Sequence, residues 1–234
     1  MKKLSYQTLE KLEVGRPVDR LSFMAEQCRD KVVLDIGCLD ETALFKKDTR
    51  HWLHGRIAEL AKSVTGLDSS NQIPPEGIAT AGNSAVFRGD ATDGETLALR
   101  GAKAEVVVAG EFIEHIDSPL QFLRQLRHAL PGRELIISTP NGACLGNALL
   151  GLIGREAQHH DHLHNFSYKT LNTLFLRAGF ESWQIIPYRF YATEMKFQSR
   201  GAWRLIVVLV EVGIRALEYL FPLLSFGYIV RTRL

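Results

Sequence analysis

Residues 105–119 have the sequence Glu-Val-Val-Val-Ala-Gly-Glu-Phe-Ile-Glu-His-Ile-Asp-Ser-Pro, and this stretch decides the fold class. A short apolar run that ends in glycine is typical of a strand buried on both faces of a parallel sheet. Ser118 is a suitable helix N-cap and Pro119 suits the first helical position. The stretch therefore predicts a buried strand that leads into a helix, which is the repeating unit of α/β proteins.

The same alternation of short apolar runs and helical patterns continues through the chain. Helical spacing of apolar residues predicts helices at 52–62, 118–130 and 168–178. Parallel strands that alternate with helices build a sheet with helices on both faces. We therefore expect an α/β fold with a Rossmann-like, doubly wound, mostly parallel sheet of seven strands. The strands are predicted at 31–37, 64–68, 85–88, 105–110, 134–138, 183–188 and 226–231.

Length and composition predict a single globular domain that spans residues 1–234. Within it we expect an N-terminal helical segment at 1–30, a substrate lid at 142–170 and an amphipathic helical insertion at 192–221. The formal net charge of +2 gives no electrostatic basis for tight nucleic-acid binding. Three widely spaced cysteines and a beginning without an apolar leader predict a cytoplasmic protein.

The segment 203–221 is strongly apolar, but four charged side chains interrupt it, so it does not fit a membrane span. At 3.6 residues per turn these charges share one narrow stripe, which predicts an amphipathic helix with a broad apolar face. We expect the apolar face to pack on the domain's own sheet. A homodimer interface and a peripheral contact with a membrane stay open as alternatives for the same face.

Four of the predicted strands end in glycine or a carboxylate. In an open parallel sheet, ligands bind beyond the carboxyl ends of the strands, at the point where the strand order reverses. Gly37 ends the first strand and lets a ligand approach the backbone closely. Asp68 ends the second and can accept hydrogen bonds from both hydroxyls of a ribose, while Asp90 after the third suits the exocyclic amine of adenine. Gly110 and Glu111 end the fourth strand.

These strand ends, with three later segments, resemble the class I S-adenosylmethionine-dependent methyltransferases from Val33 to about Phe180. The segments are 107–119 with its Glu-x-x-Glu-His pattern, Thr139-Pro-Asn141, and His164-Asn-Phe-Ser167. They are similar to ubiquinone-type O-methyltransferases, so the resemblance implies S-adenosylmethionine as cofactor. It also implies cofactor contacts at the methionine end, the ribose, the adenine and the methyl-donor channel. The implied contact residues are Asp35, Gly37, Cys38, Leu39, Asp68, Ser69, Asp90, Ala91, Gly110 and Glu111.

The first motif departs from the family pattern, which usually continues as Asp-x-Gly-x-Gly-x-Gly. Residues 35–41 are Asp-Ile-Gly-Cys-Leu-Asp-Glu, so two glycines are missing and we expect a rebuilt loop at the methionine end of the cofactor. The depleted motif leaves open a non-catalytic, methyltransferase-like binding protein. The intact Glu-x-x-Glu-His pattern argues for an enzyme, because a binding module has no need of those groups at its ligand site.

The chemistry is expected at the residues that directly follow the fourth strand. Glu111, Glu114 and His115 stand at i, i+3 and i+4, which face the same way on a helical turn. Glu111 and His115 are the predicted catalytic residues, with His115 as general base because imidazole titrates near neutral pH. Similar Glu-x-x-Glu-His enzymes, including small-RNA 2′-O-methyltransferases, use Mg²⁺ or a related divalent ion. The resemblance implies a metal set of Glu111, Glu114, His115 and His162.

A reading without a metal is also open: Glu111 would then touch only the cofactor, His115 would be held by hydrogen bonds, and the histidine-rich loop 159–164 would be part of the substrate lid. In either case we expect methylation of an oxygen atom on a small-molecule, lipid or sugar-bearing acceptor. An RNA 2′-O-methyltransferase is a weaker alternative because the chain has no clear basic stripe. The lid and the insertion carry no motif that identifies the acceptor.

Overall fold

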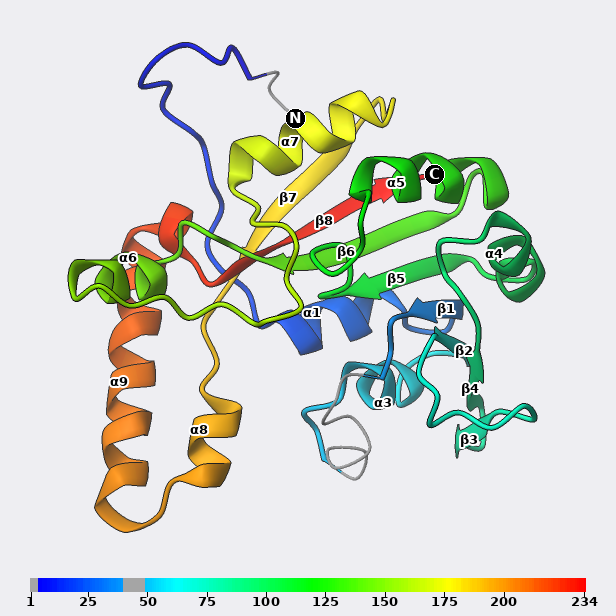
Figure 1. Cartoon of the computed structure of the whole chain (residues 1–234), viewed down its shortest axis with the longest axis horizontal. Helices are drawn as coiled ribbons and strands as arrows, with labels where there is room; N and C mark the ends of the chain where they lie inside the picture. Colours follow the sequence, from blue (N-terminus) through cyan, green and yellow to red (C-terminus); the bar gives the residue numbers. More distant parts are fainter. Residues whose placement is uncertain (1–3, 40–48) are drawn as a thin grey trace.

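The computed structural model describes residues 4–39 and 49–234. They form one sheet in the order β3-β4-β2-β1-β5-β6-β8-β7 (Figure 1). The predicted α/β class with a mostly parallel sheet is confirmed, and each of the seven predicted strands is present. The strands are β1 (Val32–Ile36), β2 (Ser63–Asp68), β3 (Ile78–Ala81), β4 (Ser84–Arg88), β5 (Val106–Gly110), β6 (Glu134–Pro140), β7 (Trp183–Tyr188) and β8 (Gly227–Arg233).

The eighth strand, β3, was not predicted. It pairs antiparallel with β4 at the edge of the sheet, with Ile78 opposite Val86 and Ala79 opposite Ala85. Its sequence Ile-Ala-Thr-Ala is short and half-buried, so its apolar signal is weak. Gly82 and Asn83 lie between the two strands. A Gly-Asn pair is typical of a two-residue hairpin turn, so the sequence did contain a signal for this hairpin.

The strand order reverses between β1 and β5. β1 pairs in parallel with β2 on one side and with β5 on the other. The chain runs outward from β1 through β2 to β4, then returns to build β5 and β6 on the opposite side. The carboxyl ends of β1 and β5 therefore meet at a topological switch point, which is where open α/β sheets bind their ligands.

Helices cover both faces of the sheet (Figure 1). On one face lie α1 (Arg20–Gln27) and α3 (Leu53–Ala58), and on the other lie α4 (Gly94–Gly101), α5 (Pro119–Ala129) and α7 (Tyr168–Arg177). Two large apolar cores correspond to these faces. The helix predicted at 52–62 corresponds to α3 and is shorter than expected. The residues that follow Ala58 turn directly into β2.

Helix α5 shows how local sequence positions the residues around the site. Ser118 caps it by accepting a hydrogen bond from the Gln121 amide, and Pro119 occupies its first turn, as predicted. Its apolar stripe includes Phe122 and Leu126, which are fully buried against the sheet. Burying each of these side chains contributes about 1.5–3 kcal/mol to folding. This packing fixes the loop 111–118 between β5 and the helix.

The N-terminal segment differs from the expectation of a helical 1–30. Among the described residues before β1, only Arg20–Gln27 is α-helical, and Asp19 caps it through the Ser22 amide. The preceding residues run as irregular chain toward α7, where the Tyr6 hydroxyl lies 2.7 Å from that of Thr173 (Figure 1). Residues 4–18 lack a 3.6-residue apolar period, so they gain little from a helix.

The insertion at 192–221 is helical, but its orientation contradicts the expectation. It forms two helices, α8 (Thr193–Gln198) and α9 (Gly201–Leu220), which project from the body of the domain (Figure 1). The charged stripe of α9 faces inward, where Glu211 and Glu218 are buried, and most of the apolar side chains of the helix are exposed. The carboxylates have fixed polar partners in residues 190–196, and these contacts set the rotation of the helix. Among the described residues, no helix is long and apolar enough to cross a membrane.

Candidate active site

Glu111 is the first residue after β5 and stands at the switch point. Its φ of +54° lies in the left-handed region, which is uncommon for a residue with a side chain. The backbone N–H of Glu111 donates to the Ser138 carbonyl at 2.8 Å, which ties the turn to β6. Strain of this kind persists only where surrounding contacts enforce it, and it concentrates at functional sites.

The Glu111 carboxylate is held by three side chains. The hydroxyls of Tyr188 and Tyr191 donate to Oε1 at 2.8 and 2.9 Å. Arg20 Nη2 lies 3.3 Å from Oε2, and its Nη1 donates to Ser138 Oγ at 3.2 Å. Burial, followed by the negative charge of Glu111, raises the pKa of both tyrosines, so they stay protonated donors. These three side chains thus hold the Glu111 carboxylate in a fixed direction.

Arg20 is nearly buried and lies over the rings of Tyr188 and Tyr191, at 5.8 and 5.6 Å from their centroids. Burial lowers the pKa of the guanidinium, but the Glu111 carboxylate and the other acidic groups around it together outweigh burial, and the pKa is raised. Arg20 is therefore always charged and balances the charge of Glu111.

Glu114 has a different environment from Glu111. Its side chain is 1% exposed, and neither carboxylate oxygen has a hydrogen-bond partner among the described residues. Burial, and then repulsion from Glu111, raise the pKa of Glu114 to about 8. The group is therefore mostly protonated at pH 7, when it can donate a hydrogen bond.

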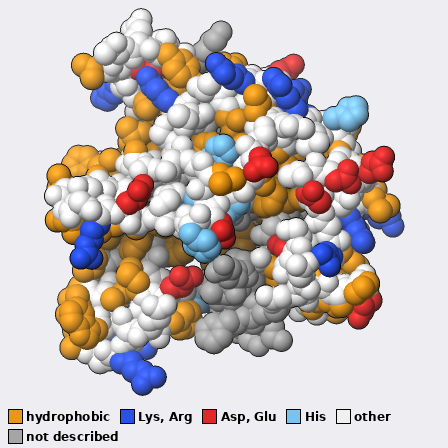
Figure 2. Space-filling model, viewed as in Figure 1, with side chains coloured by type: hydrophobic (Ala, Val, Ile, Leu, Met, Phe, Trp, Pro, Cys, Tyr) orange, Lys and Arg blue, Asp and Glu red, His pale blue; other side chains and the backbone are white. Residues whose placement is uncertain are grey.

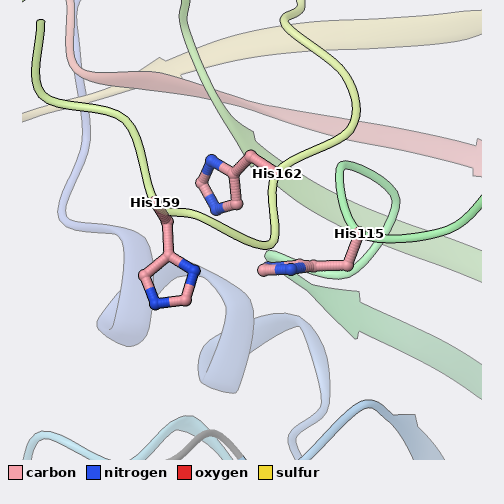
Figure 3. A group of neighbouring side chains, drawn as sticks. All are labelled: His115, His159 and His162. Carbon is pink, nitrogen blue, oxygen red and sulfur yellow. The ribbon is translucent and has the colours of Figure 1, made fainter.

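His115 lies within a cluster of three imidazoles with His159 and His162 (Figure 3). Their candidate ligand nitrogens all lie within 4.8 Å of one another. The ring of His115 stands edge-on to that of His162, with centroids 4.6 Å apart. Burial, and then the neighbouring His159, lower the pKa of His115, and burial with His115 lowers that of His162. These two rings are therefore neutral at pH 7.

The lid is attached to the Glu-x-x-Glu-His turn through its backbone. The amides of Leu163 and His164 both donate to the Glu114 carbonyl, at 2.8 and 3.1 Å. The His164 ring reaches back to the carbonyl of Asp117 at 3.2 Å. These bonds explain why a loop almost 50 residues away in sequence brings its histidines to His115. The predicted lid at 142–170 also contains a helix, α6 (Leu145–Leu152).

The expected metal set is assembled only in part. The structure brings His115 and His162 together and adds His159, a histidine of the predicted loop that was not selected. Among the described residues, the carboxylates of Glu111 and Glu114 belong to none of the side-chain clusters that could bind a metal ion. Glu111 is engaged by tyrosines and arginine instead, and Glu114 is buried beneath the turn.

At the start of the loop after β1, residues 37–39 are held by hydrogen bonds to the backbone and to side chains. Gly37 has a φ of +65°, and its N–H donates to the Leu67 carbonyl. The Trp52 indole donates to the Cys38 carbonyl at 2.7 Å, and the Leu39 amide donates to Asp68 Oδ2 at 2.9 Å. These bonds tie the predicted methionine end to the predicted ribose carboxylate. Positions 40 and 41 of the motif lie outside the described residues.

Asp68 ends β2 at the carboxyl edge, next to β1. Its Oδ1 also accepts from the Ser70 amide at 2.9 Å, which fixes the carboxylate in the turn. A carboxylate at this strand end suits the hydroxyls of a ribose, and that contact stays a prediction. The neighbouring Ser69 is exposed.

Asp90 follows β4 and is exposed, with Oδ1 accepting from both the amide and the hydroxyl of Thr92 at 2.7 Å. Ala91 is buried in the same apolar core as Leu67. The two residues thus stand where the adenine contact was predicted, and that contact stays a prediction.

Asp35 lies inside the protein rather than on the ligand side of the sheet edge. It is 1% exposed, and its Oδ2 is 2.9 Å from Nδ1 of His54, whose Nε2 is 2.7 Å from Ser84 Oγ. This buried polar chain ties β1 to α3 and β4. Any effect of Asp35 on the cofactor is therefore transmitted through the loop that it supports.

Sequence reasoning missed Arg20, Tyr188 and Tyr191. Arg20 lies at the start of a helix, and Tyr188 ends a strand whose alternation predicts only burial. Nothing in these local patterns points to a carboxylate elsewhere in the chain. His159 did carry a signal, because four of the six residues in 159–164 are histidines.

The fold and the site together define an α/β protein with polar side chains gathered at the carboxyl edge of its sheet. The chain belongs to the methyltransferase-domain family, whose model matches residues 6–185. It is therefore a methyltransferase and an enzyme, so the binding-protein alternative is not supported, and S-adenosylmethionine as its cofactor stays a prediction of the sequence. Tyr188 and Tyr191 lie just beyond the matched residues. Among curated proteins, no sequence matches the chain significantly.

Solved structures show the same fold at low sequence identity. A SAM-dependent methyltransferase from Archaeoglobus fulgidus has 17% identity and a TM-score of 0.54, over 92% of this chain and 91% of that one. One from Mesorhizobium loti has 16% identity and a TM-score of 0.52, over 92% and 96%. The plantazolicin methyltransferase BamL, solved with SAH, has 17% identity and a TM-score of 0.50, over 91% and 81%.

Proposed function

We propose that this methyltransferase acts on an oxygen atom of a small-molecule, lipid or sugar-bearing acceptor, with His115 as the general base. Methyl transfer is an in-line displacement at the sulfonium carbon, and a hydroxyl acceptor must lose its proton as it attacks. The observation that carries the proposal is the position of His115. It is half-buried, neutral at pH 7 and four residues beyond the strand end that carries Glu111.

The two carboxyl groups support this division of roles. Glu111 is fixed by Tyr188, Tyr191 and Arg20, so it is suited to orient the methyl donor rather than to move a proton. Glu114 is mostly protonated and lies beneath the turn. Of the groups that follow β5, His115 is the one that is neutral, basic and partly accessible. An RNA acceptor is less favoured, because the net charge of +2 offers little attraction for phosphates.

We propose further that His115, His159 and His162 can hold a divalent ion. A tetrahedral zinc ion binds imidazole nitrogens at 2.0–2.1 Å, so its ligands stand about 3.4 Å apart. Ligand atoms within 4.8 Å of one another reach that spacing when the loop moves inward by on the order of 1 Å. Three imidazoles suit Zn²⁺ or Co²⁺ better than Mg²⁺, which prefers oxygen ligands. When bound, such an ion would supply Lewis acidity toward an acceptor hydroxyl, and His115 would then be its ligand in place of the general base.

A transfer assay with a matched histidine control tests the base. The protein is incubated with methyl-labelled S-adenosylmethionine and a panel of phenols, sugars and glycolipids, and the product linkage is read by mass spectrometry. His115→Ala should lower transfer by about 10²–10⁴-fold, the usual contribution of a general base. His128→Ala, at an exposed position on α5, should leave it unchanged. Binding of S-adenosylhomocysteine should be similar in all three proteins.

Two results would count against the proposal: an N-methylated product, or full activity in His115→Ala. The metal is tested separately by adding Co²⁺ to the metal-free protein and recording its visible spectrum. A tetrahedral absorption band that is lost in His159→Gln supports the three-histidine site. The same spectrum in both proteins contradicts it.

A further inference from the structure

The outward face of α9 is apolar over more than half of its circumference. With successive residues about 100° apart, the exposed apolar side chains cover an arc on the order of 200°. Trp203 is 70% exposed, and Leu205 and Leu209 are each 61% exposed. Figure 2 shows hydrophobic side chains gathered at the lower edge of the molecule, where the α8–α9 hairpin projects in Figure 1. The outward face consists of Trp203, Leu205, Ile206, Leu209, Val210, Val212, Leu217, Tyr219, Leu220 and Phe221.

Polar contacts on the inner side lock α9 in this orientation. Glu211 accepts hydrogen bonds from the Ala192 amide at 3.1 Å, from Lys196 at 2.7 Å and from Arg215 at 2.6 Å. Glu218 accepts from the Phe190 amide at 2.8 Å. Turning the apolar face inward would break all four of these hydrogen bonds. The polar contacts therefore fix the rotation of the helix that leaves the apolar face exposed.

Cationic side chains lie near both ends of this face. Within α9, both carboxylates are buried and Arg204 is exposed on the same stripe of the helix as Glu211, while Glu194 on the neighbouring α8 is an exposed carboxylate. Arg200 is exposed at the amino end of the helix, and at the other end Arg16 lies 4.3 Å over the Tyr219 ring. Aromatic and cationic side chains thus mark both ends of an apolar stripe. This pattern matches the boundary between acyl chains and anionic headgroups of a bilayer.

From this pattern we infer that α9 docks in the plane of an anionic membrane surface, with its outward face among the acyl chains. A second copy of the chain is the alternative occupant of this apolar face, and the measurements below distinguish it from a membrane. The hairpin also stands beside the site, because Tyr191 directly precedes it and binds Glu111.

Vesicle sedimentation with matched variants tests the docking. The full chain is mixed with vesicles of phosphatidylcholine alone or with phosphatidylglycerol added, and the bound fraction is measured. Leu205→Gln with Leu209→Gln should lower the partition coefficient for anionic vesicles by about tenfold or more. The control changes two other exposed leucines, Leu99→Gln and Leu176→Gln, which are 75% and 50% exposed on α4 and α7. It should bind like the unmodified protein.

Two further measurements separate membrane docking from other occupants. Arg200→Gln with Arg204→Gln should weaken binding to anionic vesicles and leave binding to neutral vesicles unchanged. The tryptophan emission should shift to the blue on binding, and Trp203→Phe should abolish the shift. Equal supernatant fractions for the unmodified protein and the α9 leucine variant overturn the proposal. The proposal is also overturned if the unmodified protein does not bind vesicles and instead forms a dimer that the leucine substitutions in α9 dissociate. None of these readouts depends on methyl transfer, so they stand apart from the proposed chemistry.

Discussion

Replacing Glu114 by glutamine should change how the stability of the protein depends on pH. The pKa of Glu114 in the folded protein is about 8, and the ordinary pKa of a glutamate side chain is 4.5. Below pH 4.5 the group is protonated in both the folded and the unfolded chain. Between about pH 4.5 and 8 the unfolded chain loses this proton while the folded chain keeps it. The free energy of unfolding therefore falls as pH rises through this window, by about 1.4 kcal/mol per pH unit.

The total over the window is about 5 kcal/mol, which is a large part of the stability of a typical domain. Glutamine has a similar shape and does not titrate, so Glu114→Gln removes this slope. Urea unfolding followed by circular dichroism at several pH values between 5.5 and 8.5 gives both curves. The difference between the variant and the unmodified protein should grow steadily in favour of the variant as pH rises.

An exposed glutamate provides the matched control for this measurement. Glu76→Gln removes a carboxylate from the surface and should give a curve parallel to that of the unmodified protein. Parallel curves for Glu114→Gln as well would refute the reasoning, because they would mean that the buried carboxyl has ordinary acidity. The same variant tests whether the Glu114 carboxyl lacks a hydrogen-bond partner. If the carboxyl were ionised and paired, the substitution would lower the free energy of unfolding at every pH.

Three further predictions concern the supports of the site. Gly37→Ala should weaken S-adenosylhomocysteine binding in a calorimetric titration, because the left-handed φ of +65° is strained for alanine and the added Cβ would lie 2.4 Å from the Phe112 ring. The control Gly132→Ala has a similar φ but open space around the added Cβ, and it should bind normally. His54→Ala should lower the free energy of unfolding by about 3 kcal/mol, because it leaves a buried carboxylate unpaired; a loss below about 1 kcal/mol in urea contradicts this. Tyr191→Phe should reduce kcat, because Glu111 loses a hydrogen bond worth about 1.5–3 kcal/mol, and an unchanged kcat would show that this bond does not position the carboxylate.

The sheet was predictable because its strands are buried on both faces. A run such as Val106–Gly110 has few alternatives to a central parallel strand, and the apolar pattern that follows it has helical spacing. The edge strand Ile78–Ala81 lacks such a run and was missed. The sequence also indicated where polar groups gather, because the carboxyl ends of parallel strands share one edge.

The rotation of α9 was not predictable from its apolar pattern alone. Hydrophobic spacing defines which residues share a face, but it does not say which face meets the protein. The outcome depends on backbone groups of residues 190 and 192, which offer Glu218 and Glu211 their hydrogen bonds. Arg20 and Tyr188 were missed for the same reason, since their partner lies far away in the chain. Contacts between distant residues depend on the three-dimensional arrangement of the elements.

The side chains that hold Glu111 lie far apart in the sequence, at residues 20, 188 and 191. Contacts across such long loops form only after the intervening chain has been ordered, because closing a loop costs entropy before any contact is gained. The carboxylate therefore becomes fixed late in folding, once β7 has added to the sheet beside β8. During synthesis, a chain that has not yet reached Tyr188 has most of its fold and lacks the tyrosines that orient Glu111. Competence for catalysis thus arrives with the last part of the sheet, and partly folded forms are expected to be inactive.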